Sequence, residues 1–328
     1  MEKAGADDSS SIPAGGRAII LTGPPGAGKS TVARLLVSNF RARFMSGVTI
    51  QRANSLKEMP MTIASRVGVH LPEGLLVRLI SLAYRRLEPE IRRLDEVCGR
   101  GGTMLDIGGW YGPWTRRMAR RAERVVTIEP TPLHEVLQRT VPPNVEVIGA
   151  AASDRVGETE IWLAPWGSGA EGVSSLHRRE IHGVSKKVAL ITVDQLALDE
   201  VSFMKIDVEG HEIPVLRGAM ETIKRCRPRL FIEVEERIQP VATLNDLLES
   251  LDYHGWVRPS RVWVPLSAFD LVAHQAQTCR VAERGVARRT LWPYPRYVNS
   301  VLFLPHNRSP LQAIRPAHEL AGGANVMP

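Results

Sequence analysis

Two short apolar segments in the second half of the chain each end in carboxylates, and a single helix separates them. Residues 202–207 are SFMKID and residues 229–235 are RLFIEVE, and both are expected to form strands. Strands joined through a helix lie parallel in one sheet, so their carboxyl ends meet at one edge. Because ligands bind at that edge in open α/β sheets, the acids that end these strands are the first candidates for a functional site.

Strand and helix patterns alternate from Thr103 onward, which is typical of a mostly parallel, doubly wound sheet. The remaining strands are expected at residues 103–107, 124–129, 145–149 and 297–305, with an additional β excursion at 159–163 and 188–193. Upstream, residues 73–98 carry apolar side chains at helical spacing, and Pro89 is expected to divide them into two helices. The expected fold class is therefore α/β, in a domain over residues 71–305.

The two ends of the chain show no folding pattern of their own. Residues 1–16 are small and polar without the apolar core of a signal peptide, so we expect a disordered tail. Residues 306–328 are expected to be a loose C-terminal tail. No apolar run approaches the roughly 18 residues that a membrane helix needs, so no membrane span is expected.

Cysteine usage and charge restrict the compartment and the ligands. Cys98, Cys226 and Cys279 are far apart and show neither a disulfide framework nor a zinc spacing. A reducing cytosol fits this pattern, so we expect a cytoplasmic protein. The formal net charge of +7 favours acidic ligands or surfaces without specifying nucleic acid.

A glycine-rich turn follows the strand at 103–107. Asp106, Gly108 and Gly112 have the spacing D-x-G-x-x-x-G, and a helix is expected directly after them. Glycine lets the backbone approach a ligand closely, and the next helix offers N–H groups to an anion. The segment is therefore either a cofactor site for a pyrophosphate or carboxylate, or a plain tight turn.

The next strand ends in Glu129, 23 residues after Asp106. A carboxylate at the end of the second strand is placed to accept hydrogen bonds from two ribose hydroxyls. With the glycine-rich turn upstream, we prefer this interpretation to a surface glutamate before a proline turn. The two motifs together predict a cofactor that contains a nucleoside.

The loop after strand 202–207 carries the candidate catalytic groups. Asp207, Glu209 and His211 lie close together in the sequence, and Gly210 allows a sharp turn between them. His211 is the only side chain there whose unperturbed pKa lies near neutrality, so it is the candidate general base. Asp207 and Glu209 are expected to orient the substrate or a cation. The alternative for His211 is a helix N-terminal residue without a chemical role.

A second phosphate-binding pattern lies near the N-terminus, where Gly23, Gly28, Lys29 and Ser30 complete G-x-x-x-x-G-K-[ST]. This pattern binds nucleotide phosphates, here those of ATP or GTP with Mg²⁺. Residues 45–100 contain no apolar strand ending in a second acid for Mg²⁺. We therefore expect residues 17–70 to be a truncated phosphate-loop segment, or a nucleotide site completed by another chain, rather than a working kinase. The continuation of the loop faintly resembles a nucleoside-monophosphate kinase, in particular a guanylate kinase.

Residues 84–305 resemble the FkbM-type family of S-adenosylmethionine-dependent O-methyltransferases, most specifically in the segments KIDVEG and RPRLFIEVE. The resemblance implies a Rossmann-like class I methyltransferase fold that binds S-adenosylmethionine through the glycine-rich turn and Glu129. It also implies that Ala152, Ser153 and Asp154 line the adenine, with a polar turn as the alternative. The spacing of the acids is not specific for a metal, so no metal is assigned.

The resemblance and the acidic loop predict an enzyme that methylates a hydroxyl of a sugar or another secondary metabolite. The expected partner is a small hydroxylated acceptor, and the oligomeric state is left open. One rival is a nucleic-acid methyltransferase, but the chain lacks [DN]-P-P-[YF] after the fourth strand and a Pro-Cys nucleophile. The other rival is a nucleotide-dependent kinase or switch that depends on Lys29.

Overall fold

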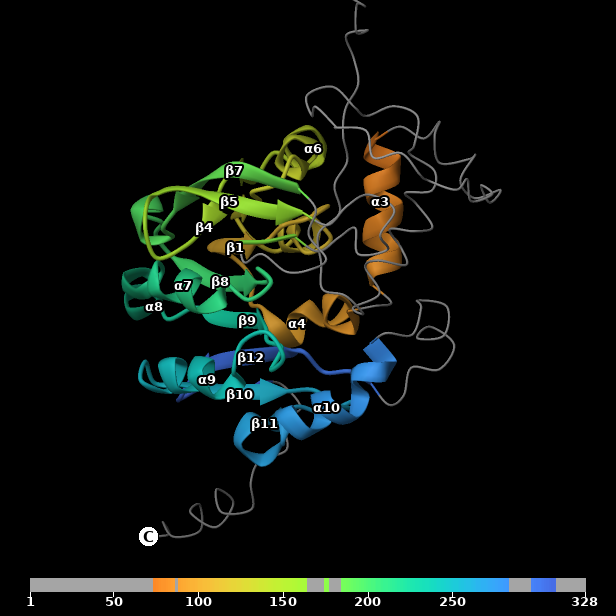
Figure 1. The fold of residues 1–328 in the computed structure, drawn as a ribbon, viewed down its shortest axis with the longest axis vertical. Coiled ribbons are helices and arrows are strands. Elements are labelled where there is room, and N and C mark those ends of the chain that lie inside the picture. Colours follow the sequence, from red (N-terminus) through yellow and green to blue (C-terminus); the bar gives the residue numbers. More distant parts are fainter. Residues whose placement is uncertain (1–72, 86–87, 164–173, 177–183, 283–295, 311–328) are drawn as a thin grey trace, which may run out of the picture.

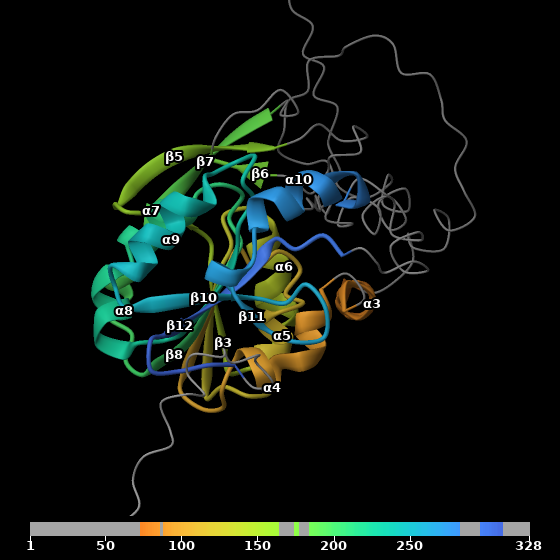
Figure 2. The ribbon, with the colours of Figure 1, turned by 90° about the horizontal axis from the view of Figure 1, so that it is seen from below.

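The chain folds around an eight-stranded sheet with helices on both faces (Figures 1 and 2). The structure is a computed structural model that describes residues 73–85, 88–163, 174–176, 184–282 and 296–310. The phosphate-loop residues Gly23, Gly28, Lys29 and Ser30 lie outside the described residues, and so do residues 1–16 and 311–328 of the two predicted tails.

Five parallel strands form the centre of the main sheet. In spatial order they are β3 (Val145–Ile148), β2 (Arg124–Ile128), β1 (Thr103–Ile107), β8 (Val201–Ile206) and β9 (Arg229–Glu233). The chain runs outward from β1 to β3 and then returns to β8 on the other side of β1. The strand order therefore reverses between β1 and β8, and a doubly wound sheet binds ligands at such a switch point. The predicted α/β fold class is confirmed.

The far edge of the main sheet is antiparallel. There β12 (Ser300–Pro305) lies between β9 and β10 (Tyr253–Val257), and β11 (Val264–Pro265) ends the sheet. β12 confirms the strand that the sequence predicts at the end of the domain. β10 and β11 are additional to the predicted strands.

A second sheet of four short strands comes from the middle of the chain. Its order is β4 (Ala151–Ala152), β7 (Val184–Ile191), β5 (Gly157–Leu163) and β6 (Ser174–Ser175). β5 and β7 pair antiparallel and confirm the predicted β excursion. Buried side chains on these strands, among them Ile161 and Leu190, form a small core of their own.

Two hydrophobic layers attach the helices to the main sheet (Figure 2). One face carries α3 (Glu73–Tyr84), α4 (Leu94–Val97), α5 (Thr115–Met118) and α6 (Leu133–Thr140), and the other carries α7 (Glu212–Arg217), α8 (Met220–Cys226) and α9 (Val241–Glu249). The other described helices are η1 (Pro89–Arg93), η2 (Asp194–Leu196), η3 (Leu266–Ala268) and α10 (Leu271–Ala282). The strands at the centre of the sheet are covered on both faces and are mostly apolar, and all five residues of β1 are buried.

Pro89 divides the helical stretch at 73–98, as the sequence predicts. α3 ends at Tyr84, and the second part consists of the 3-10 helix η1 and one turn of α-helix, α4. α3 and α10 have 12 residues each, fewer than the roughly 20 of a membrane span. In the described part of the chain, no helix is long and apolar enough to cross a membrane.

Candidate cofactor and catalytic site

The glycine-rich turn after β1 joins three strand ends. Gly108 and Gly109 donate their N–H groups to the carbonyl oxygen of Ile128, at 2.9 and 3.3 Å. Gly108 has a φ of +85°, and a Cβ atom there would lie 2.0 Å from the carbonyl oxygen of Asp207, directly after β8. Only glycine fits at this position, and the ends of β1, β2 and β8 meet there as a result.

Glu129, directly after β2, is a carboxylate with a fixed orientation. One oxygen accepts the N–H of Trp110 at 2.8 Å, and the other accepts the N–H and the hydroxyl of Thr131 at 2.9 and 2.6 Å. Burial raises the pKa of Glu129, and these hydrogen bonds oppose the rise because they favour the charged form. Trp110 has a φ of +51°, the left-handed conformation in which its N–H reaches Glu129.

Asp106 is fully buried in β1 and stabilises the glycine-rich turn through a hydrogen bond to the helix that follows it. Its Oδ2 accepts a hydrogen bond from the hydroxyl of Thr115 at the start of α5, at 2.5 Å, while its Oδ1 has no hydrogen-bond partner in the described part of the chain. Burial raises the pKa of Asp106, and the charge of Lys205 on β8 opposes the rise. Gly112, with a φ of +74°, closes the turn by donating its N–H to Gly109.

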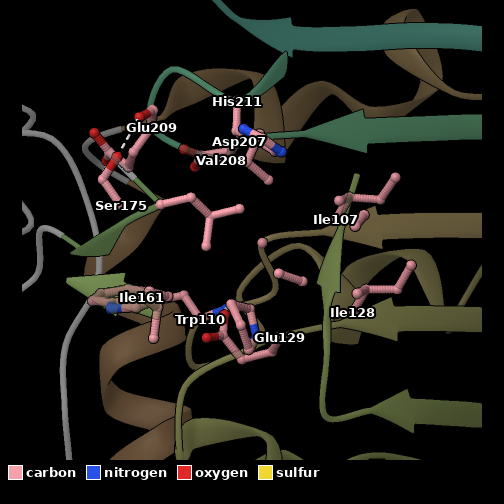
Figure 3. Close-up of a pocket in the computed structure, with 15 residues that line it drawn as sticks. Ile107, Trp110, Ile128, Glu129, Ile161, Ser175, Asp207, Val208, Glu209 and His211 are labelled. Atoms are coloured by element: carbon pink, nitrogen blue, oxygen red, sulfur yellow. Dashed lines mark hydrogen bonds between the residues drawn. The ribbon is translucent and has the colours of Figure 1, made fainter. Parts of the chain in front are cut away.

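A cavity with about 550 Å³ of empty space, its open mouth included, lies at the switch point (Figure 3). Ile107, Ile128 and Ile161 give it apolar walls. Glu129 lies on the opposite side of the cavity from Asp207 and His211 in Figure 3. The remaining lining residues are Gly108, Trp110, Pro130, Ala151, Ala152, Ser175, Leu176, Val208 and Glu209. Apolar walls with a few convergent polar groups are typical of small-molecule sites.

The loop between β8 and α7 carries the acids of this cavity. Asp207 forms an ion pair with Lys205 (Nζ–Oδ2 2.9 Å), and both side chains are buried. Glu209 has a φ of +55°, and its carbonyl oxygen accepts the hydroxyl of Ser175 on β6 at 3.0 Å. The second sheet is thereby attached to the loop, and the cavity lies between them (Figure 3).

His211 contacts the turn after β4. Its Nε2 lies 2.9 Å from Oγ of Ser153, and this Oγ also lies 3.2 Å from Oδ1 of Asp154. The Ser153 backbone meets the other end of α7, where a Cβ atom on Gly218 would lie 1.9 Å from the Ser153 carbonyl oxygen. Ser153 therefore touches both ends of α7 and fixes the position of His211.

A second, smaller cavity, whose roughly 250 Å³ of empty space includes its open mouth, shares Asp207 and Glu209 with the first. It is lined by Gly210, Ile238, Gln239 and five acids, Asp207, Glu209, Glu212, Glu233 and Glu235. Burial raises the pKa of Glu212 to about 7, although the N–H of Gly210 donates to its carboxylate at 3.0 Å. Carboxylates accept hydrogen bonds, so this cavity suits hydroxyl or ammonium groups and disfavours anions.

Three carboxylates near the second cavity have the geometry of a metal-ligand set. One oxygen each of Glu88, Asp207 and Glu233 lies within 4.8 Å of the others, and Mg²⁺ prefers such oxygen ligands. Glu88, however, accepts a hydrogen bond from the hydroxyl of Tyr84 at 2.5 Å, and Asp207 is paired with the lysine on β8. The metal therefore stays unassigned.

Five residues that the sequence predicts for the site line the first cavity: Gly108, Glu129, Asp207, Glu209 and His211. Asp106 and Gly112 lie behind it and shape the turn. The roles of all seven residues in binding and catalysis stay predictions.

Of the three residues predicted beside the adenine, Ala152 lines the first cavity, whereas Ser153 and Asp154 do not line it. Ser153 contacts His211, and Asp154 is exposed and paired with Arg155. Among the lining residues with polar groups, Trp110 and Ser175 were not predicted for the site. The hydrogen bond from Trp110 to Glu129 depends on a left-handed backbone conformation that no sequence motif marks. Ser175 lies in a glycine- and serine-rich stretch, and this composition alone is only a weak indication of a functional residue.

Comparisons with known proteins separate two parts of the chain. A family model described as methyltransferase FkbM domain matches residues 106–255, and a model described as AAA domain matches residues 14–98. A solved methyltransferase FkbM from Methylobacillus flagellatus is 17% identical with a TM-score of 0.37, and the match covers 71% of this chain and 55% of that one. This chain thus spans about half of that protein.

The N-terminal part is similar to small-molecule kinases. Cytidylate kinase of Ignicoccus hospitalis is 30% identical over 135 residues, which cover 37% of this chain and 69% of that protein. Shikimate kinase of Geobacter sulfurreducens is 33% identical over 123 residues, which cover 37% of this chain and 59% of that protein. Residues 106–255 therefore match the methyltransferase FkbM domain, and the chain carries in addition an N-terminal phosphate-loop segment that is similar to these kinases.

Proposed function

We propose that the chain transfers a methyl group from S-adenosylmethionine to a hydroxyl of a sugar or another hydroxylated secondary metabolite. The observation that carries the proposal is the meeting of Glu129, Asp207 and His211 around one cavity at the switch point. Methyl transfer from a nucleoside cofactor requires an acid for the ribose and a base for the acceptor in one place. The match of residues 106–255 to the FkbM methyltransferase domain supports the same chemistry.

The lining of the first cavity fits the parts of S-adenosylmethionine. Ile128, Ala152 and Ile161 offer apolar contact to an adenine ring. Glu129 is oriented to accept hydrogen bonds from ribose hydroxyls. Gly108 lines the cavity without a side chain, which leaves room for the methionine part of S-adenosylmethionine.

Bound S-adenosylmethionine would supply an electrophilic methyl group, and Glu129 would hold its ribose. The acceptor hydroxyl would have to lose its proton on methylation. His211, held by Ser153, is the proposed proton acceptor, and Asp207 is proposed to orient the hydroxyl because it lines both cavities. Positioning of the two reactants supplies most of the remaining rate enhancement.

The second cavity is the proposed acceptor site. Its acids can accept hydrogen bonds from several hydroxyls of one molecule, and they repel anions. We therefore propose neutral polyols as acceptors in preference to phosphorylated or carboxylated metabolites. The position of this cavity supports the proposal, because Asp207 and Glu209 separate it from the proposed cofactor cavity.

Calorimetry with S-adenosylmethionine tests the cofactor assignment. Glu129→Ala is expected to weaken binding by about 1.5–3 kcal/mol, the range for hydrogen bonds to a charged group. Glu158→Ala is the matched control, because Glu158 is exposed on β5 and does not line the cavity. Equal affinity of the two variants for S-adenosylmethionine would show that Glu129 does not bind the cofactor.

Nucleotide binding at the N-terminal phosphate loop is the second candidate function. The AAA-domain match and the similarity to cytidylate kinase favour it. Lys29 and Ser30 would contact the phosphates and Mg²⁺ of ATP or GTP. Phosphoryl transfer needs in addition a second acid for Mg²⁺ and a positioned nucleophile, so we propose binding rather than kinase activity.

A further inference from the structure

Helix α3 has one buried and one exposed apolar face. Val77, Ile80 and Tyr84 are at most 2% exposed and belong to the core cluster that also contains Trp110. Leu75, Leu79 and Leu82 are 43%, 41% and 57% exposed, and their spacing of four and three residues places them in one stripe along the helix. An amphipathic surface helix would carry polar residues there.

This leucine stripe is concentrated compared with the rest of the described surface. Six large hydrophobic side chains are exposed in the described ranges, and three of them are these leucines. The others are Val156, Val184 and Val272, each on a different part of the fold. Single exposed apolar residues are ordinary, whereas a contiguous stripe marks a contact surface.

The position of α3 in the chain indicates what contacts the stripe. α3 begins at Glu73, directly after the phosphate-loop segment. The AAA-domain match at residues 14–98 continues through α3, whereas the FkbM match begins only at residue 106. Residues 17–70 contain apolar side chains of their own, such as Leu35 and Leu36, but a segment of this size buries only a marginal core alone.

We infer that Leu75, Leu79 and Leu82 form an intramolecular docking surface for residues 17–70 of the same chain. Docking lets residues 17–70 bury apolar side chains that they cannot bury alone, and it removes the three leucines from water. α3 then belongs to both parts of the chain, with one face packed on the methyltransferase core and the other on the phosphate-loop segment. This inference does not depend on the proposed methyl transfer.

Hydrogen exchange of the full-length protein tests the docking. In the triple variant Leu75→Gln, Leu79→Gln and Leu82→Gln, peptides from residues 17–70 should exchange at least about tenfold faster, the factor that about 1.4 kcal/mol of lost protection gives. Glutamine keeps the helix propensity of α3 nearly unchanged. Val272→Gln on α10 is the matched control, because Val272 is 44% exposed on another helix. It should leave the exchange of residues 17–70 unchanged.

Peptides from residues 103–163 report whether the main domain stays intact, and they should exchange equally in all three proteins. Unchanged exchange at 17–70 in the triple variant would overturn the inference. Faster exchange throughout 103–163 would also overturn it, because the stripe would then stabilise the main domain. A wild-type dimer that the triple variant dissociates, seen by light scattering with unchanged exchange at 17–70, would assign the stripe to a second copy of the chain.

Discussion

Gly108 and Gly218 each mark a place where two backbones approach too closely for a side chain. A Cβ atom would meet a carbonyl oxygen at 2.0 Å in the first case and at 1.9 Å in the second. Both carbonyl oxygens, of Asp207 and Ser153, belong to segments that carry predicted site residues. These glycines thus determine the positions of residues proposed for the site.

Gly108→Ala should lower both stability and cofactor affinity. The φ of +85° disfavours alanine, and the clash is with backbone, which cannot rotate away. We expect a loss of about 3 kcal/mol or more in the free energy of unfolding, measured by urea denaturation. Gly99→Ala is the control, because its Cβ would meet no atom within 4 Å. Equal stability of the two variants would show that β1 and β8 do not approach as described.

Glu212 should make stability depend on pH. Burial raises its pKa from 4.5 to about 7, so the folded state binds the proton more tightly than the unfolded chain. The resulting stability is fully present below pH about 4.5 and is lost as the pH rises to about 7. Glu212→Gln should remove this loss, up to roughly 3 kcal/mol. Unfolding curves at pH 5 and pH 8 measure it, with Glu158→Gln as the exposed control. Parallel pH profiles of wild type and Glu212→Gln would contradict the assignment.

At the scale of elements, the second sheet contacts the loop between β8 and α7 at two points. Ser175 on β6 donates to the carbonyl oxygen of Glu209, and Ser153 after β4 contacts His211. The sheet therefore does more than cover the cavity, because it fixes the loop that carries the proposed base.

His211→Ala should lower kcat by about 10²–10⁴ and leave the Kd for S-adenosylmethionine nearly unchanged, if His211 accepts the proton. Ser153→Ala should lower kcat less, by about tenfold, because the ring remains but loses its hydrogen bond. Ser185→Ala on β7 is the control in the same sheet. Steady-state kinetics with calorimetry separate the two effects. Full activity of His211→Ala would leave positioning as the source of catalysis.

The central strands were predictable because a parallel strand covered on both faces is apolar at nearly every position. β1 has the predicted bounds, and β8 lies one residue from its prediction. β10, with the sequence YHGWV, contains a histidine and a glycine and becomes a strand through pairing with β12. β4 has only two residues and depends on its partner β7. Such elements depend on distant residues, which no local pattern contains.

The site residues also divide into those that a local sequence pattern predicts and those whose contacts depend on distant parts of the chain. Glu129 and Asp207 were predictable because they end apolar strands that meet at one edge. The contact between His211 and Ser153 joins residues 58 positions apart, and it requires the close approach at Gly218. The hydrogen bond from Trp110 to Glu129 requires a left-handed backbone at a bulky residue. These contacts follow from tertiary packing and leave no spacing pattern in the sequence.

At the scale of the whole molecule, charge separates the two parts of the chain. Residues 17–70 contain eight lysines and arginines and one glutamate, a net charge of +7 that equals the net charge of the whole chain. The rest of the chain is close to neutral, and its second cavity is acidic. Attraction for a polyanion such as a nucleotide is therefore expected of the phosphate-loop segment.

Lys29→Ala should leave methyl transfer and S-adenosylmethionine affinity intact while it weakens ATP and GTP binding at least about tenfold. Lys29 would contact the phosphates, and nothing in the proposed methyl transfer uses it. Lys57→Ala, in the same basic segment but outside the loop motif, is the control. The decisive measurement is methylation with and without nucleotide. Stimulation of the wild type by nucleotide, lost in Lys29→Ala, would make the segment a regulatory site.

The shared wall of the two cavities has a consequence for inhibitor design. Asp207 and Glu209 line both spaces, so a molecule in one lies next to a molecule in the other. A compound that links an adenosine group to a polyol through a short spacer would fill both at once. Its second group would bind at an effective concentration on the order of millimolar, so its affinity would exceed that of either half. If the proposed function is correct, such a bisubstrate compound would distinguish this protein from other proteins that bind S-adenosylmethionine, because only one half of the compound resembles the cofactor.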